Sequence, residues 1–318
     1  MIEIKDLSKR FGEFFAVNGL SFTVEKGDIL GFLGPNGAGK TTTMRIITGF
    51  FPPSTGYVKV DGHDVADEPL AVRRLVGYLP ESVPLYTDMR VEEYLRFVGK
   101  AKGLSAREAA ADAKKVMGLV DISGRARQLI KQLSKGFRQR VGLAQAMMAD
   151  PPILILDEPS IGLDPTQIVE IRGLIQSFAA KKTVILSSHI LPEVSATCNR
   201  VIIINKGRLV AQGSPQMLGS AASGAHGIKL VCRGEAQAVK NLLSAVPGVV
   251  GVSVDSATSD GEVTYMVEAD RGRETAASLA TAVVEAGHGL CELTPVTASL
   301  EQVFMQLVTE EAHEEVAA

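Results

Sequence analysis

The chain contains one stretch that decides its fold, Gly34-Pro35-Asn36-Gly37-Ala38-Gly39-Lys40-Thr41-Thr42. This stretch fits the pattern G-x-x-x-x-G-K-[ST] of a phosphate-binding loop. Its glycines allow a tight turn that points backbone N–H groups at an anion. We expect Lys40 to reach the β- and γ-phosphates of a nucleotide, and the Thr41 hydroxyl to ligate Mg²⁺.

The residues on either side of the loop fit the same interpretation. Residues 28–33 predict a buried strand that leads into the loop, and residues 42–47 predict a helix that leaves it. The dipole at the N-terminus of that helix also favours a phosphate group. A glycine-rich turn that matches by chance is the alternative, and the strand and helix around the loop argue strongly against it.

Length and composition set the broad class. With 318 residues the chain is long for a single core, so two domains are expected. Its 33 basic and 36 acidic side chains give a formal charge of −3, which argues against a nucleic-acid-binding surface. Cys198, Cys232 and Cys291 lack metal-ligand spacing, and we interpret them as small buried hydrophobic residues in a reducing compartment.

The sequence contains no pattern of a signal peptide and no apolar run that approaches the roughly 18 residues of a membrane span. We therefore expect a soluble protein that does not cross a membrane by itself. Such a protein can still dock on a membrane protein.

The N-terminal region predicts strands at residues 2–7, 21–25 and 58–62, with a turn at residues 9–12. Strands on both sides of the loop and its helix indicate an α/β fold, with a mainly parallel sheet and an antiparallel flank. Phe11 lies on the predicted turn, where its ring either stacks on an adenine or anchors the turn in the core. The residues alone leave these two interpretations about equal.

The middle of the chain, from about residue 84 to residue 150, predicts a helical subdomain. Residues 91–102 and 105–119 have helix periodicity, and the second segment begins with a capping-box pattern. The apolar loop at residues 83–86 is either tucked under these helices or offered to a partner, and both interpretations stay open.

Ser134 is expected to cap the helix that runs to about residue 149. A serine and a glycine at a helix N-terminus form a possible anion site, but an ordinary cap explains them equally well. This stretch alone is weak evidence for a function.

A second strong signal is the run Ile153-Leu154-Ile155-Leu156-Asp157-Glu158. Four consecutive apolar residues predict a buried parallel strand, and open α/β sheets place their ligands at the carboxyl ends of such strands. We expect Asp157 to hold Mg²⁺, directly or through water, and Glu158 to orient or deprotonate an attacking water. Two solvated carboxylates are the weaker alternative, because a phosphate loop lies upstream.

Two further features belong to the same edge of the predicted sheet. Asp164 is expected to cap a helix whose first residue is Pro165. Residues 183–188 predict another buried strand, which ends at His189. Because His189 would share an edge with Asp157, we favour a role at the γ-phosphate or at the neighbouring glutamate over a purely structural one.

The order of these motifs makes residues 1 to about 218 resemble the nucleotide-binding subunit of ATP-binding cassette (ABC) transporters. The ordered set is much more specific than any single member. In the family's order, it comprises the phosphate loop at 34–42, the glutamine-loop position at Glu81, the signature at 133–137, the acidic strand at 153–158, the Asp164 loop and the switch histidine, His189.

The resemblance implies ATP and Mg²⁺ as cofactors and ATP hydrolysis as the activity. Phe11 falls where the family places an adenine-stacking aromatic, which favours that interpretation. The nucleotide-binding positions that carry over are Phe11, Val17, Gly34, Pro35, Asn36, Gly37, Ala38, Gly39, Lys40, Thr41, Thr42, Ser134, Gly136 and Asp164. The catalytic positions are Lys40, Glu81, Glu158 and His189, and the metal positions are Thr41, Glu81 and Asp157.

Two positions depart from the common family pattern. The glutamine loop offers Glu81, which adds negative charge beside the phosphates but still has oxygens for Mg²⁺ or water. The signature reads Leu-Ser-Lys-Gly-Phe in place of Leu-Ser-Gly-Gly-Gln. Ser134 and Gly136, which the resemblance assigns to the γ-phosphate on the opposite subunit, are retained. We expect activity to survive with altered affinity or rate.

The resemblance also implies partners and a location. Two such subunits sandwich two ATP molecules, so the chain is expected to pair with a second copy or with a similar ATPase subunit. Loop residues 81–86 would transmit closure of the pair to a multi-span permease of the ABC-2 type. The expected location is cytoplasmic, on the inner face of a bacterial inner membrane, held there through the permease; no nucleic acid is expected.

The C-terminal part predicts a second, smaller domain. Residues 219–227 have the composition of a flexible linker, and residues 228–309 follow the order β-α-β-β-α-β of ferredoxin-like folds. No catalytic cluster is evident there. Residues 298–304 are similar to the closing segment of ABC-2 exporter ATPases, which implies a regulatory or dimer-contacting domain. An acidic tail at 310–318 is expected to fray.

Two other functions are weighed against an exporter ATPase. A soluble ABC ATPase acting on ribosomes or DNA usually has two cassettes or a long coiled-coil insertion, and the sequence predicts neither. A module that clamps ATP with little turnover is kept open by the changes at Glu81 and in the signature. Steady-state turnover distinguishes the clamp, and association with a membrane protein distinguishes the transporter.

Overall fold

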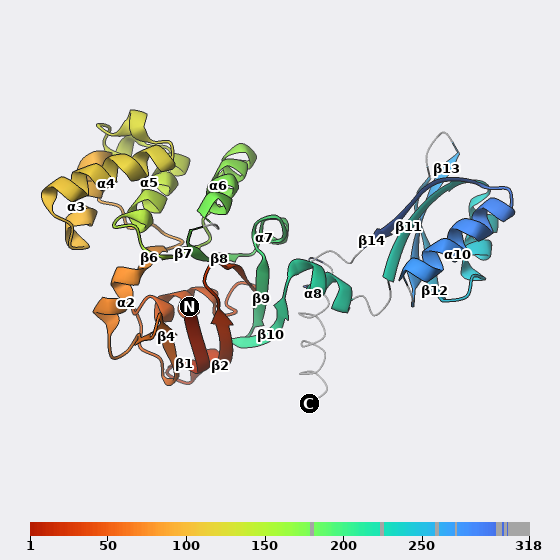
Figure 1. Ribbon diagram of the computed structural model, residues 1–318, viewed down its shortest axis with the longest axis horizontal. Coiled ribbons are helices and arrows are strands. Elements are labelled where there is room, and N and C mark those ends of the chain that lie inside the picture. The colour runs from red at the N-terminus through yellow and green to blue at the C-terminus, as the bar shows by residue number, and fades with distance from the viewer. Residues whose placement is uncertain are drawn as a thin grey trace. The chain divides into compact units, whose positions relative to one another are not determined.

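In the computed structural model, the strand before the phosphate loop, β3 (Ile29–Leu33), lies inside a six-stranded sheet of order β10-β9-β3-β8-β7-β6. The other five strands of this sheet are labelled in Figure 1. The description covers residues 1–178, 181–222, 226–257, 261–270 and 272–296, with residues 301 and 304. The other strands of this sheet are β6 (Val76–Leu79), β7 (Ile153–Asp157), β8 (Thr183–Ser188), β9 (Arg200–Asn205) and β10 (Arg208–Gly213).

Strands β6, β7, β8, β3 and β9 pair in parallel, and β10 closes the sheet in the antiparallel sense. Every residue of β3, β7 and β8 is buried, as expected for parallel strands covered on both faces. In the register, Leu33 lies opposite Ser188, and Asp157 lies opposite Ser187. The carboxyl ends of the three strands therefore meet at one edge.

A second sheet, of order β2-β1-β4-β5, forms the expected antiparallel flank. Its strands are β1 (Ile2–Phe11), β2 (Phe14–Val24), β4 (Thr55–Val60) and β5 (His63–Asp64). Apolar side chains from this sheet, from the parallel sheet and from the helix after the phosphate loop form one continuous core. Because this core includes residues of the strand before the phosphate loop and of the helix after it, it holds both ends of the loop in place.

The hairpin β1–β2 is longer than the sequence pattern predicts, and residues 9–11 belong to a strand where a turn was expected. Phe11 pairs with Phe14, and Gly12, with φ of 60°, lies between the strands. The reason is that the pairing has three register shifts along β1. Such bulges break the alternation of apolar and polar residues that marks a strand in a sequence.

Helices α1 (Lys40–Ile47), α2 (Pro69–Leu75), α6 (Pro165–Phe178) and α7 (Leu191–Thr197) connect the strands of the core. A separate helical group comprises α3 (Val91–Ala101), α4 (Ala106–Leu119), the short 3-10 turns η1 (Ser123–Arg125) and η2 (Ile130–Gln132), and α5 (Lys135–Met147) (Figure 1). The expected capping box is present, since the Ser105 side chain and Glu108 bond each other's backbone N–H.

The chain divides into two compact units, residues 1–214 and 215–318. The second contains α8 (Pro215–Ala222), β11 (His226–Arg233), α9 (Ala236–Ser244), β12 (Val249–Ala257), β13 (Glu262–Ala269), α10 (Gly272–Glu285) and β14 (Gly289–Val296). Its sheet has the antiparallel order β12-β13-β11-β14. From β11 on, the elements follow the expected β-α-β-β-α-β order, with buried Tyr265 in the core under α9 and α10.

The predicted linker is too long at both ends. Residues 219–222 complete α8, which Pro215 begins and alanines extend, because proline suits a first helical turn and alanine has high helix propensity. His226 and Gly227 are paired in β11. The predicted closing helix at 299–308, apart from residues 301 and 304, and the acidic tail lie outside the described residues. Across the described part of the chain, no helix combines the length and apolar character needed to cross a membrane.

Candidate nucleotide site

The phosphate loop owes its shape to two glycines in left-handed backbone conformations, Gly37 with φ of 81° and Gly39 with φ of 101°. A Cβ on Gly39 would lie 2.3 Å from the carbonyl oxygen of Ala16, so no side chain fits there. Gly39 is also the N-cap of α1. The first N–H groups of a helix have no partner within the helix, so the loop directs an anion site toward the carboxyl edge of the sheet.

Lys40 is the first residue of α1, and its side chain is only 7% exposed. Its Nζ donates to the carbonyl oxygens of Gly34 at 2.7 Å and Pro35 at 3.3 Å, and it lies 3.9 Å from Oε1 of Glu158. Burial lowers the pKa of Lys40, while the carboxylates of Glu158, Asp157 and Glu81 act in the opposite direction. Lys40 thus lies within the field of all three predicted acidic site residues.

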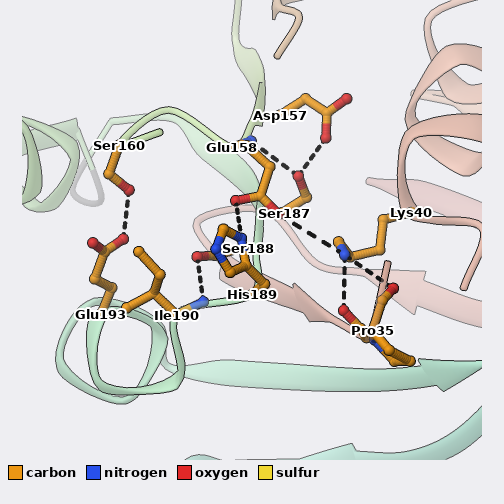
Figure 2. A network of polar contacts seen from close by, with 11 residues as sticks. Pro35, Lys40, Asp157, Glu158, Ser160, Ser187, Ser188, His189, Ile190 and Glu193 are labelled. Atoms are coloured by element: carbon orange, nitrogen blue, oxygen red, sulfur yellow. Dashed lines mark hydrogen bonds and ion pairs between the residues drawn. The ribbon is translucent and has the colours of Figure 1, made fainter. Parts of the chain in front are cut away.

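Glu158 follows β7 in a left-handed conformation, with φ of 50°, and is 6% exposed. Its Oε2 contacts Nδ1 of His189 at 2.8 Å, and its other oxygen faces Lys40 (Figure 2). Burial raises the pKa of Glu158, and the contacts with His189 and Lys40 partly oppose that rise. A carboxylate with a raised pKa is a stronger proton acceptor than an ordinary glutamate.

Asp157 is fully buried at the end of β7. Its Oδ1 accepts a hydrogen bond from Oγ of Ser187, whereas Oδ2 has no hydrogen-bond partner among the described atoms. A buried carboxylate oxygen without a partner is costly, and a cation would satisfy it. No group of three potential metal-ligating side chains gathers anywhere in the described residues. Mg²⁺ commonly binds one or two carboxylates together with substrate phosphates, and Asp157 offers one such carboxylate oxygen.

For the other predicted site residues, the structure describes no hydrogen bond or ion pair with Lys40, Asp157 or Glu158. Glu81 is exposed on the loop after β6 and lines a cavity of about 470 Å³ shared with the start of α5. Phe11 is 45% exposed, and its ring meets the ring of Phe51 edge-on, with centroids 5.7 Å apart. Val17 is fully buried behind Gly39, so in this structure it packs against the loop and offers no surface to a ligand. Thr41 is half-buried on the first turn of α1.

Ser134 and Asp164 both cap helices. The Ser134 hydroxyl accepts from the N–H of Phe137 at 3.4 Å, and Asp164 accepts from the N–H of Gln167 at 2.9 Å. Gly136 is buried against Gln167, where a Cβ would lie 2.6 Å from the amide oxygen. None of the contacts described for these residues reaches Lys40 or the two carboxylates. The structure therefore brings together the loop, Asp157, Glu158 and His189, and it leaves the signature outside that cluster.

One residue of the cluster was missed at the sequence level. Ser187 is fully buried on β8 and bonds both Asp157 and the N–H of Glu158. Part of the signal was present, because the runs at residues 153–158 and 183–188 were both predicted as buried strands that end at the same edge of a parallel sheet. The pairing of Ser187 with Asp157 also depends on the register between the two strands, which could not be read from the sequence.

Comparisons with known proteins agree on one family. A family model described as "ABC transporter" matches residues 17–161. The chain is 32% identical over 318 residues to the daunorubicin resistance ATP-binding protein DrrA3 of Streptomyces coeruleorubidus, covering 100% of this chain and 98% of that protein. It is 37% identical to the Nod factor export ATP-binding protein I of Burkholderia lata, covering 68% of this chain and 72% of that protein.

A solved structure described as the dimeric structure of a bacterial ABC transporter cassette matches 67% of this chain and 98% of its own chain. The TM-score is 0.63 at 25% sequence identity. The shared fold therefore extends over nearly the whole of that cassette.

The two left-handed loop glycines provide a matched pair of substitutions. Gly39→Ala places a Cβ 2.3 Å from a backbone oxygen, whereas Gly37→Ala meets nothing within 4 Å. Both variants carry the cost of about 1 kcal/mol for alanine with positive φ, but only Gly39→Ala must displace the loop. We expect Gly39→Ala to weaken ATP binding by at least about tenfold relative to Gly37→Ala in equilibrium dialysis. Equal affinities would contradict the fixed geometry of the loop.

The raised pKa of Glu158 predicts a pH-dependent effect on stability. The folded chain binds this proton more tightly than the unfolded chain, whose value is near 4.5. Stability from Glu158 is thus full below that value and is lost as the pH rises through the folded pKa. At about pH 8, Glu158→Gln should raise the melting midpoint of its unit by roughly 2 °C, because the amide has no charge to bury. The gain should shrink toward about pH 5; destabilisation at the higher pH would oppose this account.

Proposed function

The chain belongs to the family of ATP-binding subunits of ABC transporters, and on that premise we propose that it hydrolyses ATP to power export through a separate membrane permease. The observation that carries the proposal is the position of Glu158. Its buried carboxylate lies between Nζ of Lys40 and Nδ1 of His189, beside the phosphate loop. That position suits a base acting on a water molecule at the γ-phosphate.

Binding of ATP begins at the loop. The N–H groups of the loop and of the first turn of α1 receive the β- and γ-phosphates, and the helix dipole adds to the attraction. Lys40 exchanges its hydrogen bonds to the carbonyl oxygens of Gly34 and Pro35 for phosphate oxygens. Phe11, exposed at the end of its hairpin, offers a ring face to the adenine.

Mg²⁺ would be held by Asp157 through its unpartnered Oδ2, by the Thr41 hydroxyl and, directly or through water, by Glu81. When bound, the ion neutralises negative charge on the phosphates. Glu158 accepts a proton from water as the water oxygen bonds to the γ-phosphorus and the bond to the bridging oxygen of ADP breaks. His189, whose side chain is 49% exposed, holds Glu158 through Nδ1.

A second copy, or a similar subunit, completes the site. Ser134 is exposed at the N-terminus of α5, where it still has its hydroxyl hydrogen to donate. Together with the backbone at Gly136, next to the helix that Asp164 caps, it forms a group of donors, and none of the hydrogen bonds described for this group goes to an anion of the same chain. A γ-phosphate bound to the partner is the ligand of matching charge, and the solved cassette, which is described as dimeric, supports this arrangement.

The permease is expected at a groove between the core and the helical group. This groove, about 470 Å³ in volume, lies among the end of α1, the strand β6 and helices α3 and α5. Its lining residues are Arg45, Phe50, Val76, Tyr78, Pro80, Ser82, Pro84, Val98, Lys102, Gln145 and Ala146. Phe50 is 65% exposed. Pro80, Ser82 and Pro84 belong to the loop that carries Glu81, so a partner seated here is linked to the catalytic edge.

We assign the permease to the ABC-2 type and the chain to the cytoplasmic face of the membrane. The C-terminal unit is assigned a regulatory or dimer-contacting role. The daunorubicin resistance relative matches both units, which supports a C-terminal unit common to this branch. On the sheet of that unit, ion pairs join Lys229 to Glu292 at 2.9 Å and Arg233 to Glu262 at 2.8 Å, so part of its surface is polar.

Replacement of the proposed base separates binding from turnover. Glu158→Gln keeps the size of the side chain but removes the proton acceptor, so ATP should still bind while steady-state hydrolysis falls by roughly 10² to 10⁴-fold. ATP retained without turnover should accumulate the dimer in size-exclusion chromatography. Glu193→Gln is a matched control, because Glu193 is an equally buried carboxylate that bonds Ser160 and not Lys40. Comparable turnover in the two variants would refute the assignment of the base.

A further inference from the structure

Ser187 lies at the edge of the sheet that carries Asp157 and Glu158, and it contacts both of these residues. It is fully buried on β8, directly opposite Asp157 in the parallel register (Figure 2). The backbone N–H of Glu158 donates both to its carbonyl oxygen and to its Oγ, each at 3.1 Å. Its Oγ also contacts Oδ1 of Asp157. One side chain is therefore bonded to both acidic residues.

The direction of these hydrogen bonds follows from elementary chemistry. A backbone N–H can only donate, so the Ser187 oxygen accepts from Glu158. An ionised carboxylate can only accept, so the single hydroxyl hydrogen of Ser187 is given to Asp157. A hydrogen bond from a hydroxyl to a carboxylate is among the stronger kinds. The hydroxyl thus has one orientation that satisfies both neighbours.

For Asp157, the hydrogen bond from Ser187 determines which carboxylate oxygen remains available to a cation. Ser187 donates to Oδ1 and holds the carboxyl plane, so Oδ2 is the oxygen better placed for a cation. Oδ2 accepts no hydrogen bond in the described structure, although the nearby Tyr78 hydroxyl interacts electrostatically with Asp157. Without the hydroxyl, Oδ1 would be a second unpartnered oxygen in a fully buried side chain. The carboxyl group could then rotate, and the preference for one oxygen would be lost.

For Glu158, the bond supports an unusual backbone. Its φ of 50° is uncommon for a residue other than glycine, and the paired bonds from its N–H to Ser187 hold it there. This turn sends the Glu158 side chain toward His189 and Lys40, while Asp157 keeps its own direction. Two neighbouring carboxylates are thereby kept in separate roles.

We propose that Ser187 is a positioning residue that presents Oδ2 of Asp157 to Mg²⁺ and holds the backbone of Glu158 in its active conformation. The inference rests on the proposed function, because it assumes that Asp157 binds the metal and that Glu158 is the base. It goes further in assigning the separation of these two roles to a single residue, which acts through its hydroxyl group and its carbonyl oxygen.

The test measures how strongly Mg²⁺ strengthens the binding of AMP-PNP, which is not hydrolysed. Equilibrium dialysis of the full chain with excess Mg²⁺ and with EDTA gives the ratio of the two affinities. Ser187→Ala should leave the affinity in EDTA unchanged. It should reduce the Mg²⁺ enhancement by about tenfold, which is the lower end of the range usually found when a group that orients a metal ligand is removed. Ser187→Thr retains the hydroxyl and should restore most of the enhancement.

Ser188→Ala is the matched control. Ser188 is the next residue of β8 and is equally buried, but its hydroxyl accepts from the N–H of Ile190 and touches neither carboxylate. This variant should keep the full Mg²⁺ enhancement. Loss of folding in Ser187→Ala would lower both affinities together, whereas loss of positioning lowers only the one measured with Mg²⁺.

Asp157→Asn, measured in parallel, distinguishes a failure of the role proposed for Ser187 from a failure of the metal assignment of Asp157. If Asp157→Asn loses the enhancement and Ser187→Ala keeps it, the role of Ser187 is wrong and the metal assignment stands. If Asp157→Asn also keeps the enhancement, the metal assignment in the proposed function is wrong, and the role of Ser187 falls with it. Loss in Asp157→Asn and Ser187→Ala, with recovery in Ser187→Thr, supports the proposal.

Discussion

The carboxylate of Glu158 must carry a negative charge in a place with almost no contact with water. The free-energy cost of burying an unpaired charge is much larger than the effect of a typical point mutation on stability, so such a group needs partners of opposite charge or hydrogen bonds. Lys40 lies 3.9 Å from one oxygen, and His189 contacts the other at 2.8 Å. The first partner follows β3 and the second follows β8. The parallel order of the sheet is therefore what makes a buried carboxylate possible here, because it brings three strand ends to one edge.

The same edge holds groups whose interactions are incomplete until a ligand arrives. Oδ2 of Asp157 has no described partner, which costs about 1–3 kcal/mol. The hydrogen bonds described for Lys40 go to loop carbonyl oxygens, and the nearby carboxylates act on it electrostatically. Burial lowers the pKa of Lys40. A phosphate group satisfies the lysine, and a cation satisfies the aspartate. In the proposed mechanism, the energy of binding is thus concentrated on Mg²⁺ and the terminal phosphates, the part of ATP at which chemistry occurs.

Much of this arrangement could be predicted from the sequence, because the relevant patterns are local. The phosphate loop has fixed spacing, and two buried strands end in Asp157 and His189, so their meeting at one edge follows from parallel pairing. The contacts of Ser187 could not be predicted, since they depend on the register between strands distant in sequence. The length of the β1–β2 hairpin was underestimated because bulges disrupt the alternation of apolar and polar residues around Phe11. The position of the signature away from the cluster also agrees with a site that needs a second subunit.

The most direct test of export is capture of the tagged chain from detergent-solubilised membranes of its own host, with Mg·ATP present. Two substitutions of similarly exposed aromatics form the comparison: Phe50→Asp in the groove at the end of α1, and Phe14→Asp on the β1–β2 hairpin, 65% and 64% exposed. We predict that one multi-span membrane protein co-purifies with the wild-type chain and with Phe14→Asp, and is lost with Phe50→Asp. Only soluble partners in every sample would contradict the role in transport.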